Sequence, residues 1–231
     1  MNKPIIPDER TPTRFDLSTF RGRVYAQFDM LAVDHGIFRY VWPNRYAVSD
    51  EMYRSGLPLP FHIAQAARRG VKTIINLRGF NDSGWYYLEA EACRRHGIEL
   101  VDLPVSSRDM PKKDMLLRCP ALFDSIAYPA LMHCKSGSDR VGLMSVLYLI
   151  LRRGQPLDTA LEQLGLRYGH VKQSKTGMID FFFDAYRQYN KVSPIGFMEW
   201  VETVYDPAML KDSFHSQWWA NALVDKILMR E

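Results

Sequence analysis

Residues 129–153 read PALMHCKSGSDRVGLMSVLYLILRR, and this stretch decides the fold. The short apolar segment 129–133 predicts a buried strand, and the run 139–153 predicts a strongly apolar helix. The segment 133–140, HCKSGSDR, joins the two and is rich in small polar residues. A strand that passes through a tight, glycine-containing loop into a helix is typical of sites that bind phosphate.

Cys134 and Arg140 give this loop its chemistry. The five residues between them allow the backbone to wrap into a cup of N–H groups, and Gly137 permits a turn that residues with a Cβ disfavour. The positive end of the helix dipole favours a thiolate at Cys134, which is the nucleophilic form of cysteine. Arg140 can grip two phosphoryl oxygens with its planar fork, without a metal ion. Candidate substrate-binding residues are Lys135, Ser136, Gly137, Ser138 and Asp139.

Strands and helices alternate in the sequence before this loop. Strands are predicted over 52–56, 71–77 and 98–105, and helices over 61–70, 86–96 and 111–125. Such alternation predicts an α/β fold, a single domain with a central, mostly parallel sheet of about four to five strands flanked by helices. Beyond Leu157 only helices are predicted, over 157–166, over 175–190 and in the tail. We expect an N-terminal arm and extension packing on the catalytic domain (1–49), the catalytic domain (50–190) and a C-terminal helical extension (191–231).

The composition is that of an ordinary globular protein. Of the 231 residues, 47% are hydrophobic and 24% are charged, with a net charge of +4. Residues 191–231 contain more acidic than basic residues, so the positive excess lies in the rest of the chain. This mild basicity suits an anionic substrate, but it is too weak and too dispersed to favour nucleic-acid binding.

Cysteine usage and hydropathy indicate the compartment. The chain has three cysteines and no CxxC pair, so we expect neither a closed set of disulfides nor a zinc site, and we expect Cys93 and Cys119 to lie in the interior. The first 20 residues lack the apolar segment of a secretory signal, and the longest apolar run, 141–151, is too short to span a membrane. A cytoplasmic protein is expected. The aromatic and basic stretch 20–42 is expected to cover an edge of the sheet, with contact to an anionic membrane surface at the inner face of the membrane as the alternative.

The loop resembles a known signature. HCKSGSDR, residues 133–140, is similar to the HC(x)5R motif of the protein tyrosine and dual-specificity phosphatase superfamily. YRSGLPLP (53–60), GVKTIINLRG (70–79) and GIELVDLPVSSRDMP (97–111) resemble the small bacterial and fungal atypical dual-specificity phosphatases, so the resemblance covers roughly 50–190. It implies a protein tyrosine phosphatase-like fold that needs no cofactor.

The implied reaction is hydrolysis of phosphomonoesters through a phosphocysteine intermediate, with Cys134 as the nucleophile and Arg140 binding the phosphate. The resemblance leaves the substrate open among phosphotyrosine protein and a phosphorylated lipid, sugar or inositol. Lys135 and Arg78 could add positive charge beside the phosphate. The alternative for each is an exposed basic side chain, which is the favoured interpretation for Arg78. His133 is expected to hydrogen-bond the loop backbone.

In this superfamily an Asp on a neighbouring loop protonates the leaving group. Asp109 is the best candidate because it follows the strand predicted over 98–105, and parallel neighbouring strands would bring its loop and that of Cys134 to one edge of the sheet. Asp114, in the first turn of a predicted helix, is the rival, and its favoured interpretation is compensation of the helix dipole. Asp139 could assist protonation or hold the loop.

Val141 departs from the family pattern, because many members carry Ser or Thr directly after the arginine. That hydroxyl helps the thiolate leave, so Val141 predicts a slow second step unless Ser136 or Ser138 substitutes for it. The alternative function is therefore a catalytically weak phosphate-binding module of the same fold. Residues 170–175 are expected to form a solvated loop between helices.

Overall fold

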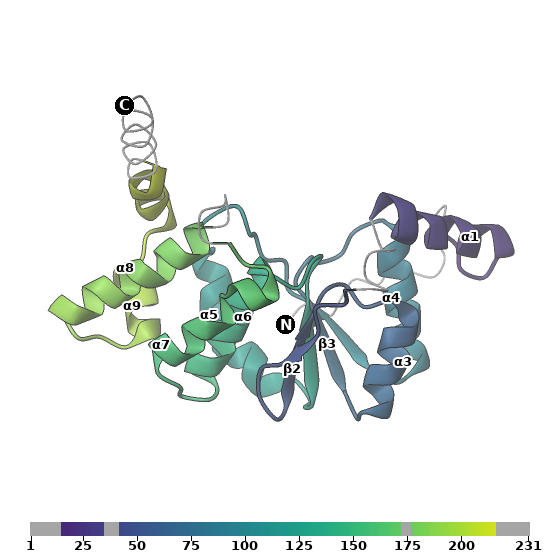
Figure 1. The fold of residues 1–231 in the computed structure, drawn as a ribbon, viewed down its shortest axis with the longest axis horizontal. Helices are drawn as coiled ribbons and strands as arrows, with labels where there is room; N and C mark the ends of the chain where they lie inside the picture. Colours follow the sequence, from purple (N-terminus) through teal and green to yellow (C-terminus); the bar gives the residue numbers. More distant parts are fainter. Residues whose placement is uncertain (1–14, 35–41, 172–176, 216–231) are drawn as a thin grey trace.

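The computed structural model describes residues 15–34, 42–171 and 177–215, and within them the expected α/β fold is confirmed. A five-stranded sheet lies between two layers of helices (Figure 1). Its strands are β1 (Tyr46–Ala47), β2 (Met52–Ser55), β3 (Thr73–Asn76), β4 (Glu99–Asp102) and β5 (Ala130–His133), in the order β1-β2-β5-β3-β4.

The sheet is parallel except for β1, which pairs with β2 in the antiparallel sense. Ser55 of β2 and Asn76 of β3 are both in register with His133 at the end of β5. The chain that follows His133 therefore leaves the sheet at its centre, between the carboxyl ends of two neighbouring strands. This is where α/β sheets place their binding sites.

Helices α3 (Pro60–Arg68) and α4 (Gly84–Arg95) cover one face of the sheet (Figure 1). The N-terminal segment, α1 (Phe20–Phe28) followed by the π-helical turn η1 (Asp29–Val33), packs on α4, so the expectation that it covers a sheet edge is wrong for its described part. The approach is close enough that a Cβ on Gly84 would lie 2.5 Å from the Ala26 Cα atom. The Asp29 carboxylate also accepts the Gly84 N–H at 2.8 Å, which fixes η1 to the start of α4.

The other face of the sheet carries the larger part of the core. Its elements are α5 (Lys113–Ser125), α6 (Asp139–Leu151), α7 (Leu157–Ala160), η2 (Leu161–Gln163), η3 (Leu166–Tyr168), α8 (Met178–Val192) and α9 (Phe197–Thr203). Nine of the 13 residues of α6, from Val141 to Leu149, are buried, which explains its apolar sequence. A single helix over 157–166 is wrong: the chain forms α7 and two short 3-10 turns there.

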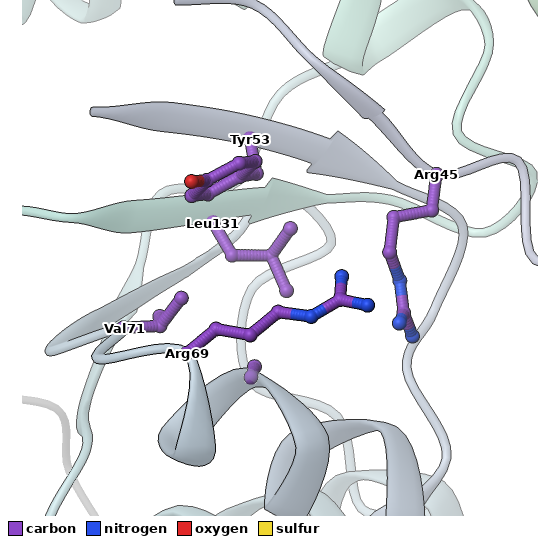
Figure 2. Close-up of a pocket in the computed structure, with 6 residues that line it drawn as sticks. Arg45, Tyr53, Arg69, Val71 and Leu131 are labelled. Atoms are coloured by element: carbon purple, nitrogen blue, oxygen red, sulfur yellow. The ribbon is translucent and has the colours of Figure 1, made fainter. Parts of the chain in front are cut away.

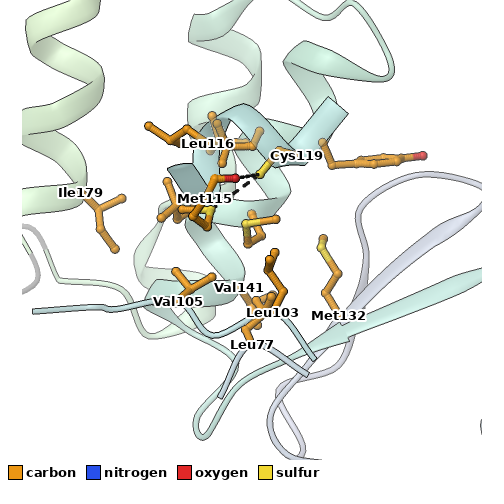
Figure 3. Packing of buried hydrophobic residues seen from close by; sticks show 14 of the residues in the cluster. Leu77, Leu103, Val105, Met115, Leu116, Cys119, Met132, Val141 and Ile179 are labelled. Atoms are coloured by element: carbon orange, nitrogen blue, oxygen red, sulfur yellow. Dashed lines mark hydrogen bonds between the residues drawn. The ribbon is translucent and has the colours of Figure 1, made fainter. Parts of the chain in front are cut away.

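Val141 lies on the buried side of α6 and packs in the same core region as Leu77, Leu103 and Val105 (Figure 3). Cys93 and Cys119 are buried, as expected, and burial raises the pKa of both thiols, that of Cys119 to about 12.

Among the described residues, helices fall short of the length and apolarity that crossing a bilayer demands. Because β1 pairs with β2, the sheet starts before residue 50; the expected domain boundaries stay a prediction.

Candidate active site

The loop 134–138 lies between the end of β5 and the first turn of α6. Its Gly137 has a φ of +79°, the left-handed conformation that glycine adopts most readily. A Cβ at this position would also approach the Gly56 nitrogen to 2.5 Å, so the loop requires glycine for two reasons. The Gly137 N–H donates to the Cys134 Sγ atom at 3.3 Å. The turn thus folds an amide donor back onto the sulfur.

The carbonyl groups of the loop are bound from outside by the surrounding framework. Leu57 N–H donates to the Lys135 carbonyl at 3.2 Å, and the Asn44 side-chain amide donates to that of Ser136 at 2.9 Å. Arg54 donates to the carbonyls of Gly137 and Ser138. In a trans peptide the N–H points opposite to the C=O, so the N–H groups of residues 136–139 face the inside of the loop. Together with the start of α6 they form a site for an anion.

Arg54 braces the loop through its carbonyls, a contact that was not predicted from the sequence. Its side chain is fully buried, with Nη1 bound to the Gln163 carbonyl at 2.7 Å and the guanidinium 3.9 Å from the centre of the Tyr168 ring. Burial lowers the pKa of Arg54 to about 10, so the side chain stays charged at neutral pH. The sequence feature that could have indicated this contact is a charged residue within a predicted strand.

Asn44, also missed, adopts a φ of +47° and donates to Tyr168 as well as to the loop, at 2.9 Å in each case. It links the chain before β1, the loop and the segment after η2. Asn tolerates this conformation better than most residues.

His133 is fully buried, and its Nδ1 atom lies 3.4 Å from the Cys134 carbonyl. Its Nε2 atom lies 2.6 Å from Oε1 of Glu89, a fully buried carboxylate on α4. This contact meets the distance of an ion pair but lacks the angular geometry of a hydrogen bond. Glu89 was not foreseen, because its position in a predicted helix suggested an exposed side chain.

Arg140 lies half-buried in the first turn of α6. Within residues 15–34, 42–171 and 177–215 no carboxylate forms an ion pair with it, in contrast to Arg78. Lys135 and Ser136 are exposed, whereas Ser138 is buried and donates to Asp139 Oδ1 at 3.2 Å. Four of the five candidate substrate-binding residues therefore share one short loop, while Asp139 and the cation of Arg140 lie in the first turn of the adjoining helix.

Asp139 belongs to a chain of polar groups centred on the buried His170. Its Oδ1 atom lies 2.7 Å from His170 Nδ1, and His170 Nε2 lies 2.7 Å from Asp180 Oδ2 on α8. Burial alone would lower the pKa of His170, but the hydrogen bonds to Asp139 and Asp180 outweigh it and raise the pKa to about 9. The expectation of a solvated loop is wrong at His170, which is 1% exposed, whereas residues 172–176 lie outside the described part.

Asp109 lies in the segment between β4 and α5. β3 separates β4 from β5, so the two strands are not neighbours, although their carboxyl ends share one edge of the sheet. The Asp109 carboxylate is half-exposed and lies 3.0 Å from Lys211 Nζ. This hydrogen bond, aided by the Met110 N–H and the charges of Lys211 and Lys112, outweighs partial burial and lowers the pKa of Asp109. The other candidate, Asp114, is exposed and pairs with Arg118 on the same helix at 3.1 Å.

Asp34, at the end of η1, reaches the rim of the loop. Its two oxygens accept from Arg78 Nη1 and Nη2, each at 2.9 Å, and Oδ1 lies 3.4 Å from Lys135 Nζ. Arg78 also stacks on the ring of Trp85 at 3.8 Å and is mostly buried. The N-terminal segment thus contributes a carboxylate that offsets the positive charge of Arg78 and Lys135. No sequence signal linked residue 34 to the loop.

Two curated proteins are similar to this chain in sequence. Dual specificity protein phosphatase TpbA of Pseudomonas aeruginosa is 30% identical over 122 residues, which are 52% of this chain and 53% of TpbA. Inositol diphosphatase DSP3 of Arabidopsis thaliana is 28% identical over 105 residues, 44% of this chain and 52% of DSP3. The chain therefore spans about half the length of the curated relatives it matches.

The crystal structure of P. aeruginosa TpbA shares the fold, with a TM-score of 0.50 and 24% identity over 62% of this chain and 84% of that one. A protein family described as "DSP-PTPase phosphatase fused to NAD+ Kinase" matches residues 52–178, from β2 to the start of α8. Because this match covers more than half of the 231 residues, the chain belongs to that family of phosphatases, within the protein tyrosine and dual-specificity phosphatase superfamily.

Proposed function

We propose that this protein hydrolyses phosphomonoesters, without a metal ion, through a phosphocysteine intermediate on Cys134. The observation that supports this most strongly is the orientation of the loop: its carbonyls are bound from outside, and the Gly137 N–H points at the Cys134 sulfur. A loop of inward N–H groups stabilises both a thiolate and the phosphoryl oxygens that replace water around it.

The proposed reaction has two steps. In the first, the Cys134 thiolate attacks phosphorus, the bond between phosphorus and the ester oxygen breaks, and the leaving oxygen takes a proton from a nearby acid. Arg140 and the loop amides bind the three remaining phosphoryl oxygens and stabilise the charge that develops on them. In the second step, water gives a proton to the carboxylate formed in the first step and attacks phosphorus, the sulfur–phosphorus bond breaks to restore the Cys134 thiolate, and inorganic phosphate leaves.

We infer that Asp109 is the proton donor and that Asp139 holds the loop. Asp139 is engaged by the buried His170, which supports a positioning role. Asp109 lies on the segment that runs along the active-site edge of the sheet, where Val105 N–H bonds to the Leu77 carbonyl. Its pairing with Lys211 favours the ionised carboxylate, so protonation of the leaving group requires Asp109 to exchange this contact for one with the substrate.

The substrate is proposed to be a phosphorylated protein or a phosphorylated small molecule, because the curated relatives are named for protein dephosphorylation and for inositol diphosphate chemistry. Asp34 offsets part of the charge of Lys135 and Arg78, which supports a substrate of moderate negative charge over a highly charged polyanion. A phosphorylated lipid is the further candidate, since Phe20, Tyr25 and Phe28 are exposed on α1 and could contact a membrane surface.

Hydrolysis of p-nitrophenyl phosphate in the presence of EDTA tests the proposal, with Cys134→Ser as the key variant and Cys93→Ser, a buried cysteine outside the loop, as the matched control. We expect vanadate-sensitive turnover by the wild type and by Cys93→Ser, and none by Cys134→Ser. Retained phosphate binding without turnover in the wild type would instead support the catalytically weak binding module. A panel of phosphotyrosine peptides, inositol phosphates, sugar phosphates and lipid phosphates then ranks the substrates.

A further inference from the structure

A small pocket lies on the sheet face that α3 covers, beside the strands β2 and β5 (Figure 2). Tyr53 of β2 and Leu131 of β5 line it and belong to the core region under α3 and α4, whereas Cys134 belongs to the core on the opposite face. The pocket is therefore separate from the proposed active site. Its lining residues are Arg45, Tyr53, Ala66, Arg69, Val71 and Leu131.

Two arginine side chains converge on this pocket. Figure 2 shows Arg45 and Arg69 reaching it from different elements, with their guanidinium groups turned toward each other. Arg45 Nη1 donates to the neutral amide of Gln65 at 3.3 Å. Among the residues that the structure describes, no carboxylate forms an ion pair with Arg45 or Arg69. Two like charges, one on the half-buried Arg45 and one on the exposed Arg69, thus lie near each other without a counter-charge among the described residues, and a bound anion would offset them.

Arg45 also has a donor without a partner. Its Nε atom is buried and forms no hydrogen bond in the described structure. A buried donor that is left unsatisfied costs about 1–3 kcal/mol. Burial and the nearby charge of Arg69 both lower the pKa of Arg45, because each disfavours the charged form of this guanidinium. Because Nε is buried, an oxyanion placed between the two guanidiniums would accept from their terminal Nη groups and would neutralise both charges.

The floor of the pocket is apolar, formed by Ala66, Val71, Leu131 and the ring of Tyr53. A ligand with only an anionic group would leave this floor exposed, and one with a small apolar body would cover it. We propose that the pocket binds a small phosphorylated molecule, with its phosphate between Arg45 and Arg69 and its apolar part against the floor. Two planar forks suit the several acceptor oxygens of a phosphate better than a single carboxylate.

The site has a direct connection to the loop. Arg45 follows Asn44, whose side-chain amide holds the Ser136 carbonyl. The inference does not require Cys134 to be catalytic, so its failure would leave the proposed function intact. The proposed ligand site is also compatible with a protein that binds phosphate at the loop without hydrolysing its esters.

Side-chain NMR of the arginine Nε–Hε groups tests the proposal. The resonances of Arg45 and Arg69 are assigned by their loss in Arg45→Lys and Arg69→Lys, and the protein is titrated with inorganic phosphate and with phenylphosphonate, whose phosphorus–carbon bond Cys134 cannot hydrolyse. The titration is repeated in Arg140→Met, which weakens phosphate binding at the loop. We expect saturable shifts of the Arg45 resonance in both proteins, with phenylphosphonate binding about threefold or more tighter than phosphate because it covers the floor.

Arg69→Gln should weaken this binding by about tenfold, the loss of one charge-assisted contact. Arg68→Gln is the matched control, since Arg68 is exposed on the same helix and does not line the pocket. Shifts that do not saturate, or equal affinity in Arg69→Gln and the wild type, would overturn the site. Tighter binding of acetate than of phosphate would overturn the assigned ligand class, and equal affinity for phosphate and phenylphosphonate would overturn the role of the floor.

Discussion

Arg54 Nη2 donates to the Gly137 carbonyl at 2.9 Å, so a buried guanidinium on β2 holds the turn that faces Cys134, the proposed nucleophile. The same nitrogen reaches the Ser138 carbonyl at 3.2 Å, and Nη1 ties the arrangement to Gln163. The proposed phosphate-binding loop is thus braced from outside by a cation on the neighbouring strand, in addition to the contacts from Asn44 and Leu57.

Arg54→Met should disturb the loop without touching the substrate. Loss of the donors leaves buried carbonyls unsatisfied, and we expect unfolding free energy to fall by about 3 kcal/mol. Loss of loop geometry should lower kcat/KM for p-nitrophenyl phosphate by about 100-fold, even at temperatures where the variant is folded. Urea titration and steady-state kinetics measure the two effects. Arg95→Met, which alters an arginine 62% exposed on α4, should change neither; wild-type activity in Arg54→Met would contradict the bracing role.

The Asp139, His170 and Asp180 chain predicts a pH dependence of stability. The pKa of His170 is raised from 6.5 to about 9 in the folded protein, so its charged contacts stabilise the fold fully below about pH 6.5. This contribution, of order 3 kcal/mol, is lost as pH rises through about 9. Unfolding free energy measured from pH 6 to 9.5 should fall in the wild type and much less in His170→Asn. An equally steep decline in His170→Asn, with exposed His96→Asn as control, would count against the assignment.

The effect of Asp109→Asn on activity should depend on the leaving group of the substrate. An alkyl phosphate leaves as a strongly basic alkoxide and needs a proton, so we expect its kcat/KM to fall by about 100-fold or more. p-Nitrophenolate is a weak base, and its ester should be affected far less. Asp114→Asn removes the same charge from the exposed start of α5 and should leave both substrates unchanged. The reverse pattern would make Asp114 the donor.

Asp34→Asn tests the charge at the rim of the loop. Removing this carboxylate leaves Arg78 and Lys135 without their shared counter-charge, and kcat/KM for an inositol polyphosphate should rise by about fivefold relative to p-nitrophenyl phosphate. The gain should shrink at high salt, because screening weakens charge effects near the surface. Asp82→Asn changes an exposed acid that bonds Tyr87 instead and serves as the control. If the ratio of the two kcat/KM values is unchanged in Asp34→Asn, Asp34 does not influence substrate preference.

The contiguous parts of this protein were predictable from the sequence. The order of strands and helices from residue 52 to 151 is confirmed, because each element carries its own periodicity and end signals. Cys134, Gly137 and Arg140 lie within one short segment, so their proximity follows from chain connectivity. The break of the predicted helix over 157–166 has a tertiary cause: Leu164 packs so closely on α6 that a Cβ on Gly142 would lie 2.6 Å from it.

The supporting residues were not predictable in the same way. Asn44, Arg54 and His170 reach the loop from segments distant in the sequence, and only the folded chain brings them together. The polar contacts of Asp34 with Arg78 span 44 residues and likewise have no local signature. Buried charged residues inside otherwise apolar elements, such as Arg54 in β2, are the sequence feature that could have indicated such contacts.

Rapid mixing with p-nitrophenyl phosphate tests the central claim most directly. Because Val141 provides no hydroxyl after Arg140, hydrolysis of the phosphoenzyme should be the slower step. The account predicts a burst of about one nitrophenolate per protein molecule, with acid quench trapping a phosphoryl group that mass spectrometry locates on Cys134. A linear time course with no phosphoryl group on Cys134, in a protein that nevertheless turns over, would contradict it.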